Sequence, residues 1–263
     1  MIKLATEYLD KPWGRCALPT DFEERDFRVG EVHFRHSQEA ELPLLVKYIF
    51  TSERLSVQVH PNDEQARRRG LPHGKTECWY IVDAERGAAV ALGFKEEISS
   101  DQIRSAALDG TIEKLLDWVP AQAGDFFFVP AGTVHAIGPG LTLVEVQQNS
   151  DTTYRLYDYG RPRELHLDDA VDVARTGPRS ADHAKRVVPD ESALLVGGEH
   201  FHLAHWVGEG VVDTFRSKDR WVIPLEGEVA AGGDVGHPGE CLLVPAAEEL
   251  WGSKGARLLI AST

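Results

Sequence analysis

Cysteine is scarce in this 263-residue sequence. The three cysteines, Cys16, Cys78 and Cys241, lie far apart and form no Cys-x-x-Cys pair. An odd number of widely spaced cysteines argues against a disulfide framework. Unpaired thiols are typical of a reducing compartment, so we expect a cytoplasmic protein.

Long apolar runs and an excess of positive charge are also missing. No apolar run approaches the roughly 20 residues that a membrane-spanning helix needs, and the opening stretch MIKLATEYLDKPWG lacks the apolar core of a signal peptide. The 28 Lys and Arg residues are outnumbered by 42 Asp and Glu residues, which gives a net charge of −14. Such a charge disfavours non-specific binding to nucleic acid or to an anionic membrane. We therefore expect neither as a partner, although a small anion would need only a local basic cluster.

The remaining composition is that of a soluble globular protein long enough for one large or two smaller β domains. Residues 124–135, GDFFFVPAGTVH, predict a buried strand over 125–129 and a Pro-Ala-Gly turn that delivers His135. The spacing Gly-x5-Pro-x-Gly-x2-His is similar to the second half of the cupin signature. An ordinary strand that ends in a solvated histidine is the alternative interpretation.

Two strands earlier in the chain carry polar residues on one face. Strand alternation over residues 55–60 places Ser56, Gln58 and His60 together, opposite three apolar residues. This pattern suits the wall of a polar pocket. Lys47 interrupts the apolar strand 42–50, and it lies either at a sheet edge or against a polar cavity.

Further polar residues follow in the next strands. Lys75 and Glu77 share one face where the strand 78–82 begins, and Arg155 lies in a polar strand over 152–159. Residues 95–119 break the β pattern. We expect Ser99 or Ser100 to cap a helix over 101–108 and Thr111 to cap a second over 113–118, as a helical insertion between two strands of one barrel.

The end of the chain contains a faint repeat of its first part. The segment Trp79–Val82 is echoed by Trp221–Pro224, and Gly124–Ala131 is echoed by Gly239–Ala246. The echo has Leu250 at the position of His135, so it keeps the fold signals and loses the histidine. We therefore predict a mainly β fold with two jelly-roll barrels. Residues 1–175 would be the metal-binding domain, 176–192 a linker and 193–263 a degenerate second domain.

Four candidate metal ligands lie on the predicted strands or strand ends: Gln58, His60, Glu77 and His135. Two imidazoles and a carboxylate are usual ligands for Zn²⁺, Fe²⁺ or Mn²⁺, and the same set forms the facial triad of iron oxygenases. The ligands alone therefore do not choose the reaction.

At this point the sequence resembles the type I phosphomannose isomerases, a cupin family, in their short bacterial form. The resemblance runs from about residue 7 to 175, and it rests on the stretches LPLLVK at 42–47, LSVQVHPND at 55–63, GKTE at 74–77, VPAGTVHA at 129–136 and QNSDTTYRLYD at 148–158. The Gln-x-His-Pro strand together with the Asn-Ser-Asp-x3-Arg segment is specific to the family. The Pro-x-Gly-x2-His motif alone would indicate only a cupin.

The resemblance implies one zinc ion bound by the four ligands and the interconversion of mannose 6-phosphate and fructose 6-phosphate through a cis-enediol. Arg155 would stabilise the enediolate, while Lys75 and Asp151 match residues for ring opening or proton relay. Ser56, Lys47 and Arg161 match positions on the phosphate side. As alternatives, Asp151 only shapes a turn, Lys47 and Arg161 are surface charges, and Ser56 is a packed hydroxyl.

One position departs from the family pattern. Larger members often have a histidine directly before the lysine of the Lys-x-Glu motif, whereas this chain has Gly74 there and His73 one residue earlier. The proton carrier would then be His73, Lys75, Asp151 or a zinc-bound water. Two other functions stay open, an Fe or Mn cupin dioxygenase and a non-catalytic sugar-phosphate-binding cupin. We expect a monomer or a homodimer.

Overall fold

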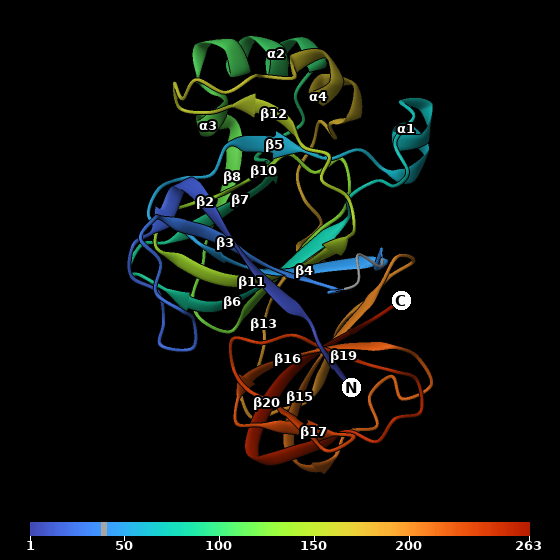
Figure 1. Ribbon diagram of the computed structural model, residues 1–263. Coiled ribbons are helices and arrows are strands. Elements are labelled where there is room, and N and C mark those ends of the chain that lie inside the picture. The colour runs from blue at the N-terminus through green and yellow to red at the C-terminus, as the bar shows by residue number, and fades with distance from the viewer. Residues whose placement is uncertain (38–40) are drawn as a thin grey trace.

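The computed structural model describes residues 1–37 and 41–263, which form a mainly β protein of three sheets with a small group of helices at one end (Figure 1). Within this part of the chain no helix is long and apolar enough to cross a membrane. All three cysteines are unpaired, as the sequence predicts.

Two sheets make up the first barrel. The five-stranded sheet has the order β12 (Tyr154–Tyr157), β5 (Val57–Val59), β10 (His135–Ile137), β7 (Ala89–Phe94) and β8 (Leu116–Pro120). The seven-stranded sheet has the order β13 (Ala184–Arg186), β9 (Asp125–Val129), β6 (Glu77–Ala84), β11 (Leu141–Gln148), β4 (Leu44–Phe50), β3 (Val29–Arg35) and β2 (Ala5–Arg15). Every strand pair in both sheets is antiparallel.

The third sheet is built mostly from the end of the chain. Its main path is β1 (Ile2–Lys3), β19 (Leu242–Val244), β16 (Arg220–Glu226), β20 (Trp251–Ser262), β15 (His202–Val211) and β14 (Ala193–Gly197), with β17 (Val229–Ala231) and β18 (Asp234–Gly236) beside it. The N-terminal residues therefore pair with the C-terminal sheet, and the Met1 amino group forms an ion pair with Glu248 at 2.7 Å.

Apolar clusters lie between the layers. Trp79, Leu92 and Leu143 belong to a cluster inside the first barrel, where side chains of both its sheets meet. A larger cluster joins the outer face of the seven-stranded sheet to the C-terminal sheet and includes Phe34 and Trp221. These two interfaces remove apolar surface from water and hold the three sheets in one stack, which Figure 1 shows from the side.

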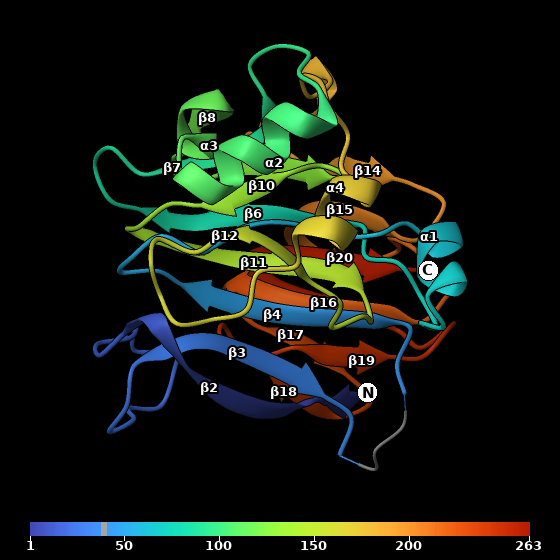
Figure 2. The same ribbon diagram turned by 90° about the horizontal axis from the view of Figure 1, so that it is seen from above.

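The helices cover the outer face of the five-stranded sheet. These are α2 (Ser100–Asp109), α3 (Ile112–Leu115) and α4 (Leu167–Val173), and their apolar residues share a cluster with β5 and β12 (Figure 2). His60 directly follows β5 and lies between it and the short helix α1 (Asp63–Arg68), and a 3₁₀ turn η1 (Ala181–His183) precedes β13.

The structure confirms the capping of the first helix in the 95–119 insertion and corrects the second. The Ser99 side chain accepts a hydrogen bond from the Gln102 amide, and the Gln102 side chain accepts one from the Ser99 amide, so the pair forms a capping box. The prediction of helix over 113–118 was wrong beyond Leu115, because residues 116–120 form β8 and pair with β7. Thr111 makes no capping bond, since its hydroxyl and amide both donate to Asp109.

The repeat seen in the sequence has a structural counterpart. Trp79 pairs with Phe127 in the first barrel, and Trp221 pairs with Leu243 in the C-terminal sheet. Gly132 has a φ of 85°, in the left-handed region that favours glycine, and its counterpart in the repeat, Ala247, has a φ of 63°. The C-terminal turn therefore has the same backbone conformation without the glycine. Within the expected linker 176–192, residues 184–186 form β13 and pair with β9.

Candidate active site

The His60, Glu77 and His135 side chains converge inside the first barrel. Their candidate ligand atoms all lie within 4.8 Å of one another, and the three side chains are at most 2% exposed. His60 Nε2 lies 3.5 Å from one Glu77 oxygen, and His135 Nε2 lies 3.4 Å from the other. His60 and His135 are 75 positions apart in the sequence. They meet here because His135 on β10 pairs directly with Gln58 on β5, two residues before His60.

Backbone carbonyls fix both imidazoles. His60 Nδ1 donates to the Thr152 carbonyl and His135 Nδ1 to the Thr133 carbonyl, each at 2.8 Å. Burial lowers the pKa of each histidine below its usual range, and for His60 the charge of Lys75 acts in the same direction. Both rings are therefore neutral, and each has its Nε2 lone pair directed at the shared centre. This is the arrangement that metal-ligating histidines have.

The Glu77 carboxylate fits the same interpretation. Both its oxygens are buried and accept no hydrogen bond from any described residue, although Lys75 Nζ lies 2.9 Å from Oε2 as an ion-pair partner. A buried carboxylate normally has its oxygens satisfied. Two His nitrogens and a carboxylate whose Oε1 has no hydrogen-bond donor form a donor set suited to Zn²⁺ or a similar divalent ion.

Gln58 completes the group of four predicted ligands. Its amide nitrogen lies 3.3 Å from His135 Nε2, and its Oε1 accepts a hydrogen bond from Ser56 Oγ at 3.3 Å. The nitrogen and oxygen of an amide exchange places by a 180° rotation. After that rotation Oε1 would face the centre and the amide nitrogen would donate to Ser56, so the hydroxyl can orient Gln58 as a ligand.

A cavity of about 440 Å³ lies against this group. Among the predicted site residues, those that line it are Lys47, Ser56, Gln58, Lys75, Asp151 and Arg155. Six lining side chains are Lys or Arg and four are Asp or Glu, namely Lys11, Arg35, Lys47, Lys75, Arg155 and Arg163 against Glu7, Glu31, Glu145 and Asp151. The cavity therefore has an excess of two positive charges in a chain whose net charge is −14.

Most of these cations are already paired. Lys47 Nζ lies 2.8 Å from Glu145 and 3.8 Å from Glu31, and Lys75 Nζ lies 3.6 Å from Glu145. Burial alone would raise the pKa of Glu145, but the two lysines lower it overall. Burial likewise opposes the charge on Lys47, yet Glu145 and Glu31 raise its pKa above the usual range. The Lys47 ammonium is thus paired with the carboxylates of Glu145 and Glu31. This pairing argues against the predicted phosphate contact.

Arg155 differs from the other cavity cations. Among the described residues no carboxylate lies within ion-pair distance of it, its Nε is buried without a hydrogen-bond partner, and Nη1 donates to the Glu164 carbonyl at 2.9 Å. Arg155 is also directly cross-strand from Gln58. An arginine without an ion-pair partner beside the metal-ligand group is a natural partner for an anionic oxygen.

The structure separates Arg161 from the cavity. Its guanidinium donates to Asp158, to Glu53 and to the Arg54 carbonyl, and it is not a lining residue. The lining residue is Arg163, two positions further on, which the sequence reasoning did not select.

Gly74 leaves no room for a side chain. A Cβ atom built there would lie 2.5 Å from the Asn62 carbonyl carbon and 2.6 Å from the Asp63 nitrogen, which are backbone atoms. The Gly74 amide donates to Asp63 Oδ1 at 2.7 Å. His73 is exposed and does not line the cavity, so of the proton carriers considered the cavity contains the side chains of Lys75 and Asp151.

Glu145 and Glu31 were missed from the sequence. Glu145 is 3% exposed, accepts a hydrogen bond from the Trp79 indole at 2.9 Å and connects the two lysines. Strand alternation could have found it, because Glu145 and Gln147 share the face of β11 whose other members pack inside the barrel. Glu31 lies on β3 and accepts from His33 Nε2 at 2.7 Å, with His33 taken as its Nε2–H form.

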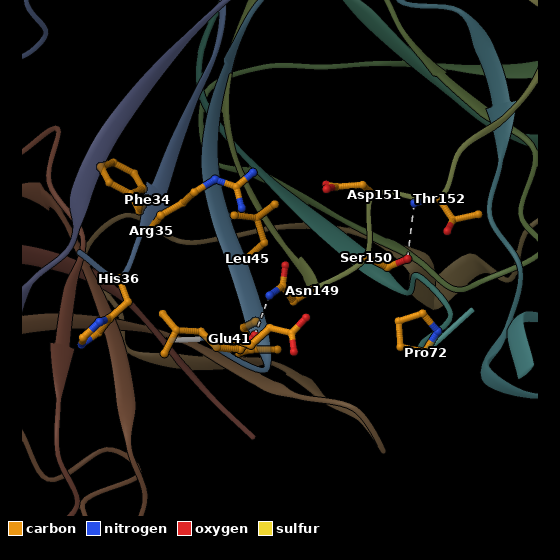
Figure 3. A pocket seen from close by; sticks show the side chains of 12 residues that line it. Phe34, Arg35, His36, Glu41, Leu45, Pro72, Asn149, Ser150, Asp151 and Thr152 are labelled. Atoms are coloured by element: carbon orange, nitrogen blue, oxygen red, sulfur yellow. Dashed lines mark hydrogen bonds between the residues drawn. The ribbon is translucent and has the colours of Figure 1, made fainter. Parts of the chain in front are cut away.

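A second cavity, of about 460 Å³, opens beside the first. Arg35, Ser150 and Asp151 line both cavities, and Figure 3 shows Asp151 and Ser150 on one side and Arg35 on the other, with Leu45 and Asn149 between them. Asp151 therefore lies at the boundary of the two cavities.

Comparison with known proteins agrees with this site. Residues 22–98 match the model of the catalytic domain of phosphomannose isomerase type I. The mannose-6-phosphate isomerase of Streptococcus mutans is 35% identical over 242 residues, which cover 87% of this chain and 76% of that protein. The solved mannose 6-phosphate isomerase of Bacillus subtilis is 26% identical with a TM-score of 0.82, and 99% of each chain is covered.

A zinc-bound mannose 6-phosphate isomerase structure shares the fold, at 15% identity and a TM-score of 0.75 over 99% of this chain and 98% of that one. The sheets described above are therefore the cupin fold of these structures. From the identity and coverage of these relatives, the chain belongs to the type I phosphomannose isomerase family.

Proposed function

We propose that the protein is a zinc-dependent isomerase that interconverts mannose 6-phosphate and fructose 6-phosphate. The observation that carries this proposal is the buried His60, Glu77 and His135 group beside a cavity lined by Arg155, a cation without an ion-pair partner among the residues described. The relatives named mannose-6-phosphate isomerase give the substrate.

The zinc ion would be held by Gln58, His60, Glu77 and His135. When bound, it supplies a Lewis acid that polarises the sugar oxygens at C1 and C2. The carbonyls of Thr152 and Thr133 support this role, because they hold the ligating nitrogens in place before a metal arrives.

Arg155 is proposed to stabilise the negative charge that develops on the enediolate oxygen. Removal of the proton from C2 of the open-chain aldose leaves an electron pair that spreads onto the C1 oxygen. Transfer of the C2 hydroxyl proton to the C1 oxygen and return of a proton to the C1 carbon then give the ketose. A preorganised cation in a cavity shielded from water stabilises such charge more than solvent does. Burial and the nearby Arg163 lower the pKa of Arg155, but an arginine stays charged at any physiological pH.

Lys75 and Asp151 are proposed to assist ring opening and proton relay. Lys75 Nζ lies between Glu77, at 2.9 Å, and His60 Nε2, at 3.3 Å, while Asp151 is exposed at the cavity boundary. We add Glu145 as a group that holds Lys75 in place from the other side. Ser56 lines the same cavity, so its contact with the phosphate stays a prediction.

The other two functions fit the cavity less well. A dioxygenase for aromatic compounds has no use for a lining with excess positive charge, whereas an anionic sugar does. A binding protein without turnover was favoured only by Gly74, and the packing of Gly74 against residues 61–63 gives that glycine a structural reason.

We further propose the division of the chain that the sequence suggests. Residues 1–175 would be the catalytic domain and residues 193–263 a degenerate cupin domain without metal ligands. Two strands cross this division, because β1 pairs with β19 of the second domain and β13, from the linker, pairs with β9 of the first. The three free thiols support a cytoplasmic location, and a small sugar phosphate is the expected partner of a monomer or homodimer.

The test is a coupled assay for fructose 6-phosphate formed from mannose 6-phosphate by metal-stripped protein with and without zinc. Arg155→Ala should lower kcat by about 100-fold or more, as removal of one oxyanion partner does. The matched control is Arg175→Ala, which removes an exposed arginine outside the cavity and should leave kcat within about two-fold of wild type. Equal rates for Arg155→Ala and wild type would remove Arg155 from the chemistry.

A further inference from the structure

Arg163 is a cavity cation that does not belong to the metal-ligand group. It lines the cavity together with Lys11 and Trp13, and its charge acts on neighbouring Arg155. Arg155 in turn is cross-strand from Gln58, so Arg155 is the cation next to a predicted metal ligand and Arg163 is its cationic neighbour. A hexose 6-phosphate has its reacting carbons at one end and its phosphate at the other, so its phosphate needs a cation other than those beside the metal ligands.

Two contacts hold the Arg163 guanidinium in one orientation. Nε and Nη2 donate to the two oxygens of Asp158, each at 2.6 Å, and Asp158 is only 2% exposed. The guanidinium carbon lies 4.9 Å from the centre of the Trp13 ring, and Trp13 is 5% exposed. A planar cation fixed by a bidentate carboxylate and an aromatic ring loses little freedom when it binds a ligand.

The same contacts leave Arg163 with donors to spare. A guanidinium has five N–H bonds, of which two go to Asp158, so three remain. Planar donors of this kind match the oxygens of a phosphate. Lys11 also contacts Trp13, with Nζ 5.7 Å from the ring centre, but its charge is paired with Glu31 at 3.5 Å.

The charge balance also favours an anion here. Asp158 accepts from both Arg161 and Arg163, so one carboxylate is shared by two arginines. Arg161 has a second carboxylate in Glu53, at 3.1 Å, whereas Arg163 has no other among the residues described. The other cavity cations are either paired, as Lys47 is with Glu145, or beside the ligand group, as Arg155 is.

We propose that Arg163 binds the phosphate group of the substrate, and that Asp158 and Trp13 are positioning residues that hold Arg163 for this purpose. The inference deepens the proposed function and rests on it. It replaces Arg161, which the sequence suggested and which donates its bonds away from the cavity.

The test compares Arg163→Gln with Arg161→Gln in the zinc-loaded full chain. Both variants remove one positive charge, with two bonds to Asp158 in Arg163→Gln and one in Arg161→Gln, but only the first changes the cavity. The readout is the ratio of kcat/KM for mannose 6-phosphate to kcat/KM for unphosphorylated mannose. We expect this ratio to fall by about ten-fold or more in Arg163→Gln, mostly through KM, because a charge-assisted bond to phosphate is lost. Arg163→Lys should recover part of the loss, since it restores the charge without the planar fork.

Arg161→Gln should keep the ratio within about two-fold of wild type. An unchanged ratio in Arg163→Gln, or an equal fall in both variants, would overturn the inference. If the wild type converts neither sugar, the proposed function fails, and calorimetric titration with mannose 6-phosphate then tests Arg163 alone. About ten-fold weaker binding by Arg163→Gln supports the inference, and equal binding, or no binding by the wild type, contradicts it. Thermal unfolding of both variants shows whether either has lost its fold.

Discussion

Lys47→Met is the substitution that best tests the buried charge network. Methionine keeps the length and the apolar stem of the lysine but removes the ammonium group between Glu145, at 2.8 Å, and Glu31, at 3.8 Å. Glu145 is 3% exposed, and the side chain of Glu31 is 12% exposed. The variant would therefore leave two buried negative charges short of one positive charge.

The expected cost follows from the partners that stay. Removing one member of a buried ion pair typically costs about 3–5 kcal/mol of unfolding free energy. Here Glu145 keeps Lys75 at 3.6 Å, and Glu31 keeps Lys11 at 3.5 Å and His33 at 2.7 Å. Since neither carboxylate becomes fully unpaired, we expect the lower end of that range, about 3 kcal/mol at neutral pH.

The cost should depend on pH in a definite direction. In the wild type, burial would raise the pKa of both Glu31 and Glu145, but their cationic neighbours lower it below the usual value. The two carboxylates therefore contribute to stability above about pH 4.5, and this contribution is lost on further acidification. Without Lys47, burial prevails and the pKa of Glu145 should rise above that value. The folded variant would then take up a proton that the unfolded chain does not, and the difference between variant and wild type should shrink between about pH 7 and pH 5.

The measurement is urea unfolding of metal-free wild type and Lys47→Met at a series of pH values, so that zinc binding does not contribute. Lys95→Met is the matched control, because Lys95 is exposed and donates only to the Lys114 carbonyl; it should change stability by less than about 0.5 kcal/mol. A cost for Lys47→Met below about 1 kcal/mol, or one that does not change with pH, would refute the idea of a buried network centred on Lys47.

Two further predictions concern Gly74 and the histidines. Gly74→Ala should destabilise the fold by about 3 kcal/mol, because the new Cβ meets the Asn62 and Asp63 backbone at 2.5 and 2.6 Å. Gly198→Ala, whose Cβ meets nothing closer than 3.4 Å, should cost less than about 0.5 kcal/mol in the same urea titration. Similar costs for both would show that the backbone of residues 61–63 can move to accept the Cβ. Because the pKa values of His60 and His135 are lowered in the folded protein, the metal-free protein should lose stability as pH falls below about 6.5. In that range these histidines take up protons in the unfolded chain but stay neutral in the folded one. His135→Gln should make the slope of unfolding free energy against pH shallower, and an unchanged slope would show that the buried ring is not neutral.

Much of the site could be predicted because its signals are local. The alternation around Gln58 and the turn that ends at His135 each specify which way a side chain points, and the structure brings those side chains together as strand partners. The echo at 239–246 likewise predicted a second copy of the strand and turn, and Ala247 shows that the backbone follows it.

Other features depend on packing between distant segments, which one sequence does not reveal. Arg161 and Arg163 both follow the same motif and both pair with Asp158, but Arg161 also binds Glu53 and the Arg54 carbonyl and does not line the cavity. Lys47 was open between an edge and a polar cavity, and its true partners lie on β3 and β11. The strand at 116–120 looked helical because its pairing partner, β7, lies across the insertion.

The most direct test of the central claim is to follow both sugar phosphates by NMR with zinc-loaded protein, starting from mannose 6-phosphate in one sample and from fructose 6-phosphate in another. The account predicts that the two samples reach the same mixture of the two compounds, and that neither changes when the metal has been removed. If each sugar phosphate persists unchanged beside zinc-loaded protein that binds it, the protein is not the isomerase that its site and its relatives indicate.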